Sequence, residues 1–141
     1  MATTFAFKLV TPTGVLFEGQ VEQVNAVNPL GEFGVLADHV NYITSLVPGV
    51  MSIRTAEGRT LQYLVTGGLV EVRDGEMTAL APEADPLEKV LPPEELELRS
   101  TEDEFSQMNV TDARYEEVRH RLMLLRARRD IAEARRLGAT H

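Results

Sequence analysis

Closely spaced turn signals divide the first 82 residues, and they constrain the fold more than any other feature of the sequence. Proline and glycine recur about every eight to twelve residues, and both interrupt helices and central strands. Asp74-Gly75 is a strong hairpin signal, because glycine adopts positive φ at no steric cost. Ala56–Arg59 predicts a second hairpin loop.

The stretches between these signals are rich in strand-forming residues. Eight or more short strands in so short a segment favour a β-sandwich or a flattened barrel. The pair Gly67-Gly68 predicts a bulge or a close approach of two backbones, because it lacks side chains. The expected strands are at about residues 5–10, 15–17, 21–27, 43–46, 50–53, 60–65, 69–72 and 77–80.

The composition changes at Pro82, where strand-forming residues give way to Glu, Leu, Arg and Ala. Pro86, Pro92 and Pro93 exclude a long helix through the first part of this tail. A first helix can begin with Pro93 in its first turn and continue to about Phe105, and a short polar linker follows it.

A second helix is predicted from about residue 112 to the residue before Gly138, which is placed to end it. Thr111 or Asn109 offers an N-cap, and Asp112 lies in the first turn, where the helix dipole favours an acid. The apolar stripe of this helix consists of Tyr115, Val118, Leu122 and Leu125, and then of Leu124, Ala127, Ile131 and Ala134.

The net charge of −8 argues against nucleic acid as the main partner. The charge is unevenly distributed. Residues 83–104 carry nine acids and two bases, net −7, whereas residues 112–141 carry five acids and eight arginines, net +3. These two blocks either face water, attract each other or bind an oppositely charged partner.

The sequence contains no residue pattern typical of an enzyme. It has no cysteine, and His39, His120 and His141 are scattered, so we expect no disulfide and no metal site. It also has neither a phosphate-binding glycine loop nor a nucleophile elbow. No apolar stretch approaches the roughly 20 residues of a membrane span, and no secretory leader opens the sequence. We therefore expect a protein that acts by contacting other proteins and not by catalysis.

The segment from Gly31 to His39 needs a separate explanation, because it is long for a hairpin connection. It is either an irregular loop whose Phe33 and Leu36 pack on the sandwich, or a docking loop. Binding residues concentrate on loops that a rigid scaffold holds. For His39, a hydrogen-bonded structural role is favoured over a catalytic one.

Five motifs follow one another in this chain with a characteristic spacing. They are Gly31-Glu32-Phe33-Gly34-Val35-Leu36-x-x-His39, Leu9-Val10-Thr11-Pro12, Phe17-x-Gly19-x-Val21, Leu46-Val47-Pro48-Gly49 with Ile53, and Tyr63-Leu64-Val65-x-Gly67-Gly68-x-x-Glu71-Val72. Together they resemble the epsilon subunit of bacterial-type (F-type) rotary ATP synthases. The resemblance covers residues 5–85 closely and the tail by its general character.

This resemblance implies a β-sandwich of about ten strands that carries a C-terminal α-helical hairpin. Residues 1–85 would form a rotor-docking domain, and residues 86–141 a helical regulatory domain. The family function is that of a non-catalytic central-stalk subunit of the proton-translocating ATP synthase. Such a subunit couples the membrane c-ring to the gamma subunit, and its tail restrains ATP hydrolysis at the alpha and beta subunits. It is peripheral to the cytoplasmic face of the cell membrane.

The resemblance also assigns roles to residues by position. Gly31, Glu32 and Phe33 would contact the polar loops of the c-ring, and His39 would lie in the segment that faces gamma. Basic residues of the tail would contact an acidic stretch of beta as a group, because guanidinium groups pair well with carboxylates. These residues are Arg114, Arg119, Arg121, Arg126, Arg128 and Arg129.

Two departures from the family pattern matter. Some members bind ATP between the tail helices through an Ile/Leu-Asp-x-x-Arg-Ala motif, which Val110–Tyr115 matches only in part. Arg114 is present, but Thr111 stands where the acid belongs and Tyr115 replaces the small residue, so we expect no bound ATP or other cofactor. Pro92-Pro93 breaks a helix that usually runs unbroken, so we expect a later start and a longer connector.

A free-standing ATP-sensing or ligand-binding β-domain is the alternative function. Tight binding of ATP to the isolated chain would favour this alternative, and copurification with gamma would favour the rotor subunit. An enzyme is a more distant alternative, because no nucleophile or base stands out in the sequence.

Overall fold

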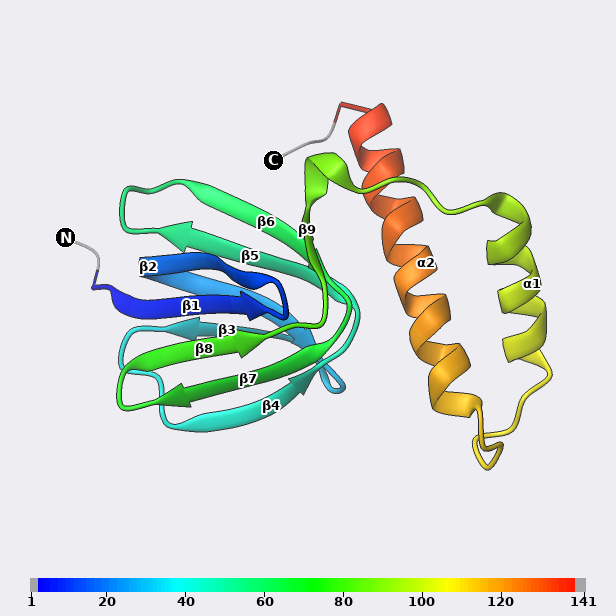
Figure 1. Cartoon of the computed structure of the whole chain (residues 1–141), viewed down its shortest axis with the longest axis horizontal. Coiled ribbons are helices and arrows are strands. Elements are labelled where there is room, and N and C mark those ends of the chain that lie inside the picture. Colours follow the sequence, from blue (N-terminus) through cyan, green and yellow to red (C-terminus); the bar gives the residue numbers. More distant parts are fainter. Residues whose placement is uncertain (1–2, 139–141) are drawn as a thin grey trace. The chain divides into compact units, whose positions relative to one another are not determined.

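The computed structural model describes residues 3–138, which divide into two compact units, Met1–Leu87 and Glu88–His141. The first unit contains the strands and the second the two α-helices (Figure 1). The elements are β1 (Phe5–Thr11), β2 (Gly14–Asn28), β3 (Gly31–Leu36), β4 (Tyr42–Leu46), β5 (Gly49–Thr55), β6 (Thr60–Val65), β7 (Gly68–Arg73), β8 (Glu76–Leu80), β9 (Ala84–Pro86), the 3₁₀ turn η1 (Leu87–Lys89), α1 (Glu95–Ser106) and α2 (Tyr115–Arg136).

The strands form a β-sandwich in which β2 belongs to both layers (Figure 1). The first half of β2 pairs with β1, and the order continues through β8 and β7 to β4. The second half of β2 pairs with β3 on one side and with β5 on the other, and β6 and β9 follow β5. The predicted sandwich is confirmed, with nine strands among residues 3–138 where about ten were expected.

The prediction of two separate strands at residues 15–17 and 21–27 is wrong, because β2 is continuous over 15 residues. Glu18 and Gly19, which lie between the two predicted strands, both stay in register with β1. Glu18 lies opposite Lys8 at 3.8 Å, so this pair favours the ladder. Gly19 lies opposite Phe7, and a Cβ there would only touch the ring of Phe17 at 3.6 Å, so this position does not require glycine.

The core of the sandwich follows from the alternation of the strands. Phe5, Phe7 and Leu9 of β1 are buried, and the residues between them are half-exposed, as the two-residue period of a strand requires. The rings of Phe7 and Phe17 lie 5.8 Å apart in a tilted arrangement. A single apolar cluster therefore joins the two layers.

Both predicted hairpins are present. The β7–β8 turn places Asp74 at φ 51° and Gly75 at φ 81°, which is the geometry of a type I′ turn. Residues Ala56–Arg59 connect β5 and β6. The expected close approach at Gly68 is also present, because a Cβ there would collide with the carbonyl oxygen of Leu80.

The prediction of a loop at residues 31–36 is wrong, because this segment is strand β3. Phe33 lies opposite Ala26, and Val35 lies opposite Val24. The side chains of Phe33 and Val35 therefore face the core. Gly34 faces the side chain of Asn25, which leaves no room for a Cβ. Glycine is usually a loop signal, but Gly34 is a strand residue, and its missing side chain avoids the side chain of Asn25.

The tail is a helical hairpin with a small apolar core of its own. Leu98 of α1 packs against Leu122 and Leu125 of α2, and Phe105 covers this cluster. The rings of Phe105 and Tyr115 lie 5.2 Å apart. This confirms the two predicted helices.

The predicted starts of both helices need correction. Helix α1 begins at Glu95, so Pro93 lies outside its first turn, and Glu94 is extended at φ −67° and ψ 133°. Helix α2 begins at Tyr115, because the Asp112 carboxylate accepts a hydrogen bond from the backbone N–H of Asn109 (2.8 Å) and stabilises a turn. The predicted end is confirmed: Gly138 has φ 78°, and its N–H donates to Arg135 O.

Candidate functional site

An exposed row of apolar side chains crosses the outer face of one sheet. The strand register places Leu69 beside Leu80, Leu80 beside Val10, and Val10 beside Val15. The exposed fractions of Leu69, Leu80 and Val15 are 45%, 48% and 52%. Leu9, Val70 and Ala79, which lie next to this row in β1, β7 and β8, are buried, so these three strands are apolar on both faces at this level only. We call Leu69, Leu80, Val10 and Val15 the outer apolar row.

Strand β4 extends this apolar surface. Ile43 is 61% exposed and pairs with Glu71, so it lies diagonally beside Leu69. Exposed apolar side chains that are contiguous across strands mark contact sites more often than scattered ones do. Sequence reasoning missed this surface. The signal was that two apolar residues follow each other near one end of each strand, one buried and one facing outward, as in Leu9-Val10, Leu69-Val70 and Ala79-Leu80.

The outer face of the other sheet is polar. Asn25 lies opposite Ser52, and Ser52 lies opposite Gln62. The Gln62 side-chain amide donates to Ser52 Oγ (3.0 Å), and the Gln23 amide donates to Asn25 Oδ1 (3.1 Å). The two outer faces therefore differ in chemistry, and only the first resembles a protein-docking surface.

The β2–β3 turn carries the three residues that were predicted to contact a c-ring. Gly31 and Glu32 are exposed there. Phe33 is half-buried against the core, with its ring 6.0 Å from that of Tyr42, so it supports the turn from inside. The structure also places Leu30, which sequence reasoning did not single out, fully exposed at the same turn.

His39, predicted to face gamma, lies in the connection between β3 and β4. Its Nδ1 is 2.7 Å from Val40 O, and its ring is 5.7 Å from that of Tyr42. Asn41 Oδ1 accepts a hydrogen bond from the N–H of Asp74 (2.9 Å), which ties this connection to the β7–β8 turn. His39 therefore sits at the entry to the strand that carries Ile43.

The six tail arginines that were predicted to contact beta all have partners within the tail. Two bind carboxylates of α1: Arg114 binds Glu104 (3.0 Å), and Arg126 binds Glu102 (3.4 Å). Arg121 lies 3.6 Å from Glu117, and Arg119 lies 3.5 Å from Glu116. Arg129 lies 3.2 Å from Asp130. The opposite charges of the two blocks thus attract each other.

Arg128 binds the connector that precedes α1. Its Nε donates to Leu91 O (3.0 Å), and its Nη2 donates to Pro92 O (3.3 Å). Arg135, which sequence reasoning had not included, donates from Nη2 to Val90 O (2.6 Å). Because Pro92 and Pro93 interrupt regular hydrogen bonding, the connector carbonyls need donors from elsewhere, and α2 supplies them. We call these three bonds the arginine clasp.

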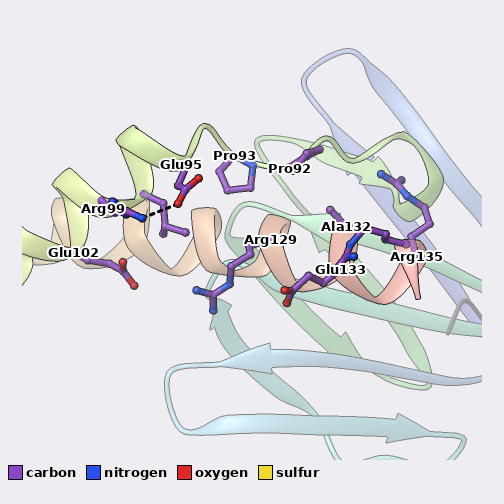
Figure 2. Close-up of a pocket in the computed structure, with 11 residues that line it drawn as sticks. Pro92, Pro93, Glu95, Arg99, Glu102, Arg129, Ala132, Glu133 and Arg135 are labelled. Carbon is purple, nitrogen blue, oxygen red and sulfur yellow. Dashed lines mark hydrogen bonds and ion pairs between the residues drawn. The ribbon is translucent and has the colours of Figure 1, made fainter. Parts of the chain in front are cut away.

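A groove of about 680 Å³ lies beside the clasp, between the start of α1 and the end of α2. Figure 2 shows the side chains that line it. Its floor is apolar, with Leu98, Ala132 and the two prolines. Its charged lining is mixed, with Arg99, Arg129, Arg135 and Arg136 against Glu95, Glu102 and Glu133. Arg99 and Glu95 form an ion pair at 2.8 Å.

The stretch that partly matches the ATP motif lies elsewhere. Residues 110–115 form the turn between the helices and the start of α2, and none of them lines the groove. Arg114 is engaged by Glu104 and by Glu117. The structure therefore does not bring the motif and the groove together.

Among residues 3–138, no three His, Asp or Glu side chains gather as metal ligands would. His141, the third histidine of the metal argument, lies outside the described residues. In the same part of the chain, no helix is both long and apolar enough to cross a membrane.

The sandwich matches a known family over residues 4–87. That family is described as ATP synthase, Delta/Epsilon chain, beta-sandwich domain. The chain belongs to this family. The resemblance inferred from the five sequence motifs is confirmed.

The relatives of this chain include ATP synthase epsilon chains. One from Bradyrhizobium is 39% identical over 87 residues, which are 62% of this chain and 64% of the relative. One from Rhodopseudomonas palustris is 45% identical over 78 residues, which are 55% of this chain and 57% of the relative. The chain thus matches less than two thirds of the length of these relatives.

Solved structures share the fold. A chain of the Euglena gracilis mitochondrial ATP synthase aligns with a TM-score of 0.69 at 22% identity, over 90% of this chain and 80% of that one. A chain of the Tetrahymena thermophila mitochondrial ATP synthase aligns with a TM-score of 0.57 at 17% identity, over 89% of this chain and 98% of that one.

Replacing Arg128 by alanine should loosen the connector, because it removes two of the three bonds of the arginine clasp. These bonds are exposed, so we expect the opening free energy of the segment to fall by about 1–2 kcal/mol. Hydrogen exchange at the amides of Val90 and Leu91 measures this change.

Arg121→Ala is the matched control, because Arg121 pairs with Glu117 of its own helix. Exchange at Val90 and Leu91 should stay at the wild-type rate in this variant. Equal acceleration in both variants would contradict the clasp.

Proposed function

We propose that this chain is a non-catalytic central-stalk subunit of a proton-translocating ATP synthase, which joins the gamma subunit to the c-ring. The family of the sandwich supports this proposal. The observation that carries it is the outer apolar row, because a face of this kind needs a protein partner. Relatives named ATP synthase epsilon chain and fold neighbours in ATP synthase assemblies are consistent with it.

Gamma is the partner that we assign to the outer apolar row. Burying the exposed parts of Leu69, Leu80 and Val15 gains about 1 kcal/mol each, before the cost of association. Ile43 widens the surface, and His39 lies at the entry to the strand of Ile43. We therefore assign His39 to the margin of the same interface.

The c-ring is the partner that we assign to the β2–β3 turn. Gly31 and Glu32 are exposed there and can reach polar loops, and Phe33 anchors the turn in the core. A subunit with these two surfaces lies at the cytoplasmic face of the membrane and is held there by its partners. Its part in ATP synthesis and proton transport is mechanical and not catalytic.

The tail would act as a brake on ATP hydrolysis. In the folded tail, Arg114 and Arg126 are bound to carboxylates of α1. An acidic stretch of beta could take over these arginines, because guanidinium groups bind carboxylates of either origin equally well. Exposed ion pairs contribute only about 0–1 kcal/mol each, so a partner can replace them. Arg119, Arg121, Arg128 and Arg129 would complete the basic surface of the opened tail.

We also propose that the tail acts without a bound nucleotide. Three carboxylates offset three of the four arginines of the groove, which leaves a net charge of only +1, and the residues that match the ATP motif lie outside it. An ATP-sensing domain would need the residues that match the ATP motif to line the groove, together with an excess of positive charge.

Replacing Leu80 by aspartate should weaken the binding of gamma by about 2–4 kcal/mol, roughly 30- to 700-fold, because it places a charge in a desolvated contact. Titration of labelled full-length chain with purified gamma measures this. Gln62→Asp, which puts the same residue on the polar outer face, is the control and should bind gamma normally. Equal weakening by both variants would exclude the outer apolar row as the interface.

Truncation after Pro86 should raise ATP hydrolysis by the assembled enzyme several-fold, because it removes all six arginines of the brake. A coupled ATPase assay on complexes with equal gamma content measures this. Arg99→Gln removes a tail charge outside this group and should leave the rate unchanged. An unchanged rate in the truncated complex would count against the brake.

Calorimetry of the full chain with Mg-ATP should show no binding tighter than about 1 mM, because three carboxylates leave the groove with a net charge of only +1. The double variant Glu95→Gln, Glu133→Gln raises this net charge to +3 and should bind ATP more tightly than the wild type. Micromolar binding by the wild type would instead favour the ATP-sensing domain.

A further inference from the structure

Leu30 is the most exposed large apolar side chain among residues 3–138, with an exposed fraction of 97%. It lies in the β2–β3 turn, directly before Gly31 and Glu32. Turns of this kind usually carry polar residues, which interact well with water. A leucine at this position loses the hydrophobic stabilisation that burial against a partner would supply.

A buried side-chain amide fixes the backbone beneath Leu30. Asn28 is only 6% exposed, and its Oδ1 accepts a hydrogen bond from the N–H of Leu30 (2.9 Å). The Nδ2 of Asn28 donates to the hydroxyl of Tyr42 (3.0 Å). Gly31 follows at φ 126°, which only glycine adopts readily. The leucine is therefore presented from a rigid turn, and little conformational entropy is lost when it binds.

Tyr42 connects this turn to the segment of His39. Its ring lies 6.0 Å from the ring of Phe33 and 5.7 Å from that of His39. Asn28 and Tyr42 hold the backbone of the turn through these bonds. They are positioning residues, and Leu30 is the group that they present.

We propose that Leu30 is an apolar anchor that inserts into a notch between loops of the c-ring, beside a basic or hydrogen-bonding group that receives Glu32. This inference rests on the proposed function, which assigns the β2–β3 turn to the ring. The inference adds Leu30 as the side chain that supplies affinity for the ring. It also adds the hydrogen bonds of Asn28 as the contacts that hold the backbone of Leu30 in place.

A protein partner fits this turn better than a lipid surface does. Proteins that lie on membranes combine several apolar side chains with lysine and arginine. Here a single leucine is followed by the anion Glu32, and residues 1–82 carry a net charge of −4. A rigid, isolated leucine beside one charge instead resembles an anchor residue at a protein interface, which is surrounded by polar contacts.

The test uses full-length chain bound to gamma and measures its affinity for purified c-ring in detergent. Leu30→Ser should weaken the binding about tenfold, as the loss of an anchor does, and Leu30→Met should restore most of the affinity. Val110→Ser removes another exposed apolar side chain, 76% exposed in the tail, and should have no effect. Tyr42→Phe removes only the hydroxyl, and it should speed amide exchange at Leu30 and weaken ring binding less than Leu30→Ser does.

The outcomes separate this inference from the proposed function. Normal ring binding by Leu30→Ser, together with weakened binding by Glu32→Gln, would overturn the anchor and leave the ring as the partner. Binding of the wild type to vesicles of phosphatidylcholine and phosphatidylglycerol, lost in Leu30→Ser, would overturn the choice of a protein partner. If the wild type bound neither gamma nor the ring, the proposed function itself would fail.

Discussion

The continuous pairing of β2 with three other strands is the constraint on which the rest of the sandwich depends. One strand of 15 residues pairs with β1 through its first half and with β3 and β5 through its second half. Its buried residues Val21, Val24 and Ala26 belong to the core that both layers share. Because one strand fixes both layers, it also fixes where the β2–β3 turn projects and which strands carry the outer apolar row.

The function of the sandwich then follows from the side chains that this strand pairing leaves exposed. One outer face carries the outer apolar row and the other is polar, so an apolar partner surface fits only the first. The β2–β3 turn presents Leu30, Gly31 and Glu32 from a backbone that a buried asparagine holds. The tail has only a small apolar core, and exposed ion pairs between its helices and the arginine clasp on its connector add contacts that a partner can replace. Rigid docking surfaces and a replaceable tail suit a rotor subunit with a regulatory arm.

Local signals predicted much of this structure, and pairing between distant segments decided the rest. The Asp74-Gly75 turn, the close approach at Gly68 and the helix end at Gly138 each depend on one residue and its φ angle, so the sequence reveals them. The continuity of β2 through Glu18 and Gly19 depends on β1, and the strand character of residues 31–36 depends on β2. The outer apolar row arises only when four strands are placed in register. The partners of the tail arginines likewise require the hairpin to be folded.

Hydrogen exchange of the full chain, alone and bound to gamma, tests the central claim most directly, because it reports each strand separately. If gamma binds the outer apolar row, the amides of β7, β8 and the end of β1 near Val10 should exchange more slowly in the complex. The amides of β5 and β6 should exchange at an unchanged rate. Slower exchange confined to β5 and β6, or no change in any strand of a saturated complex, would contradict the account.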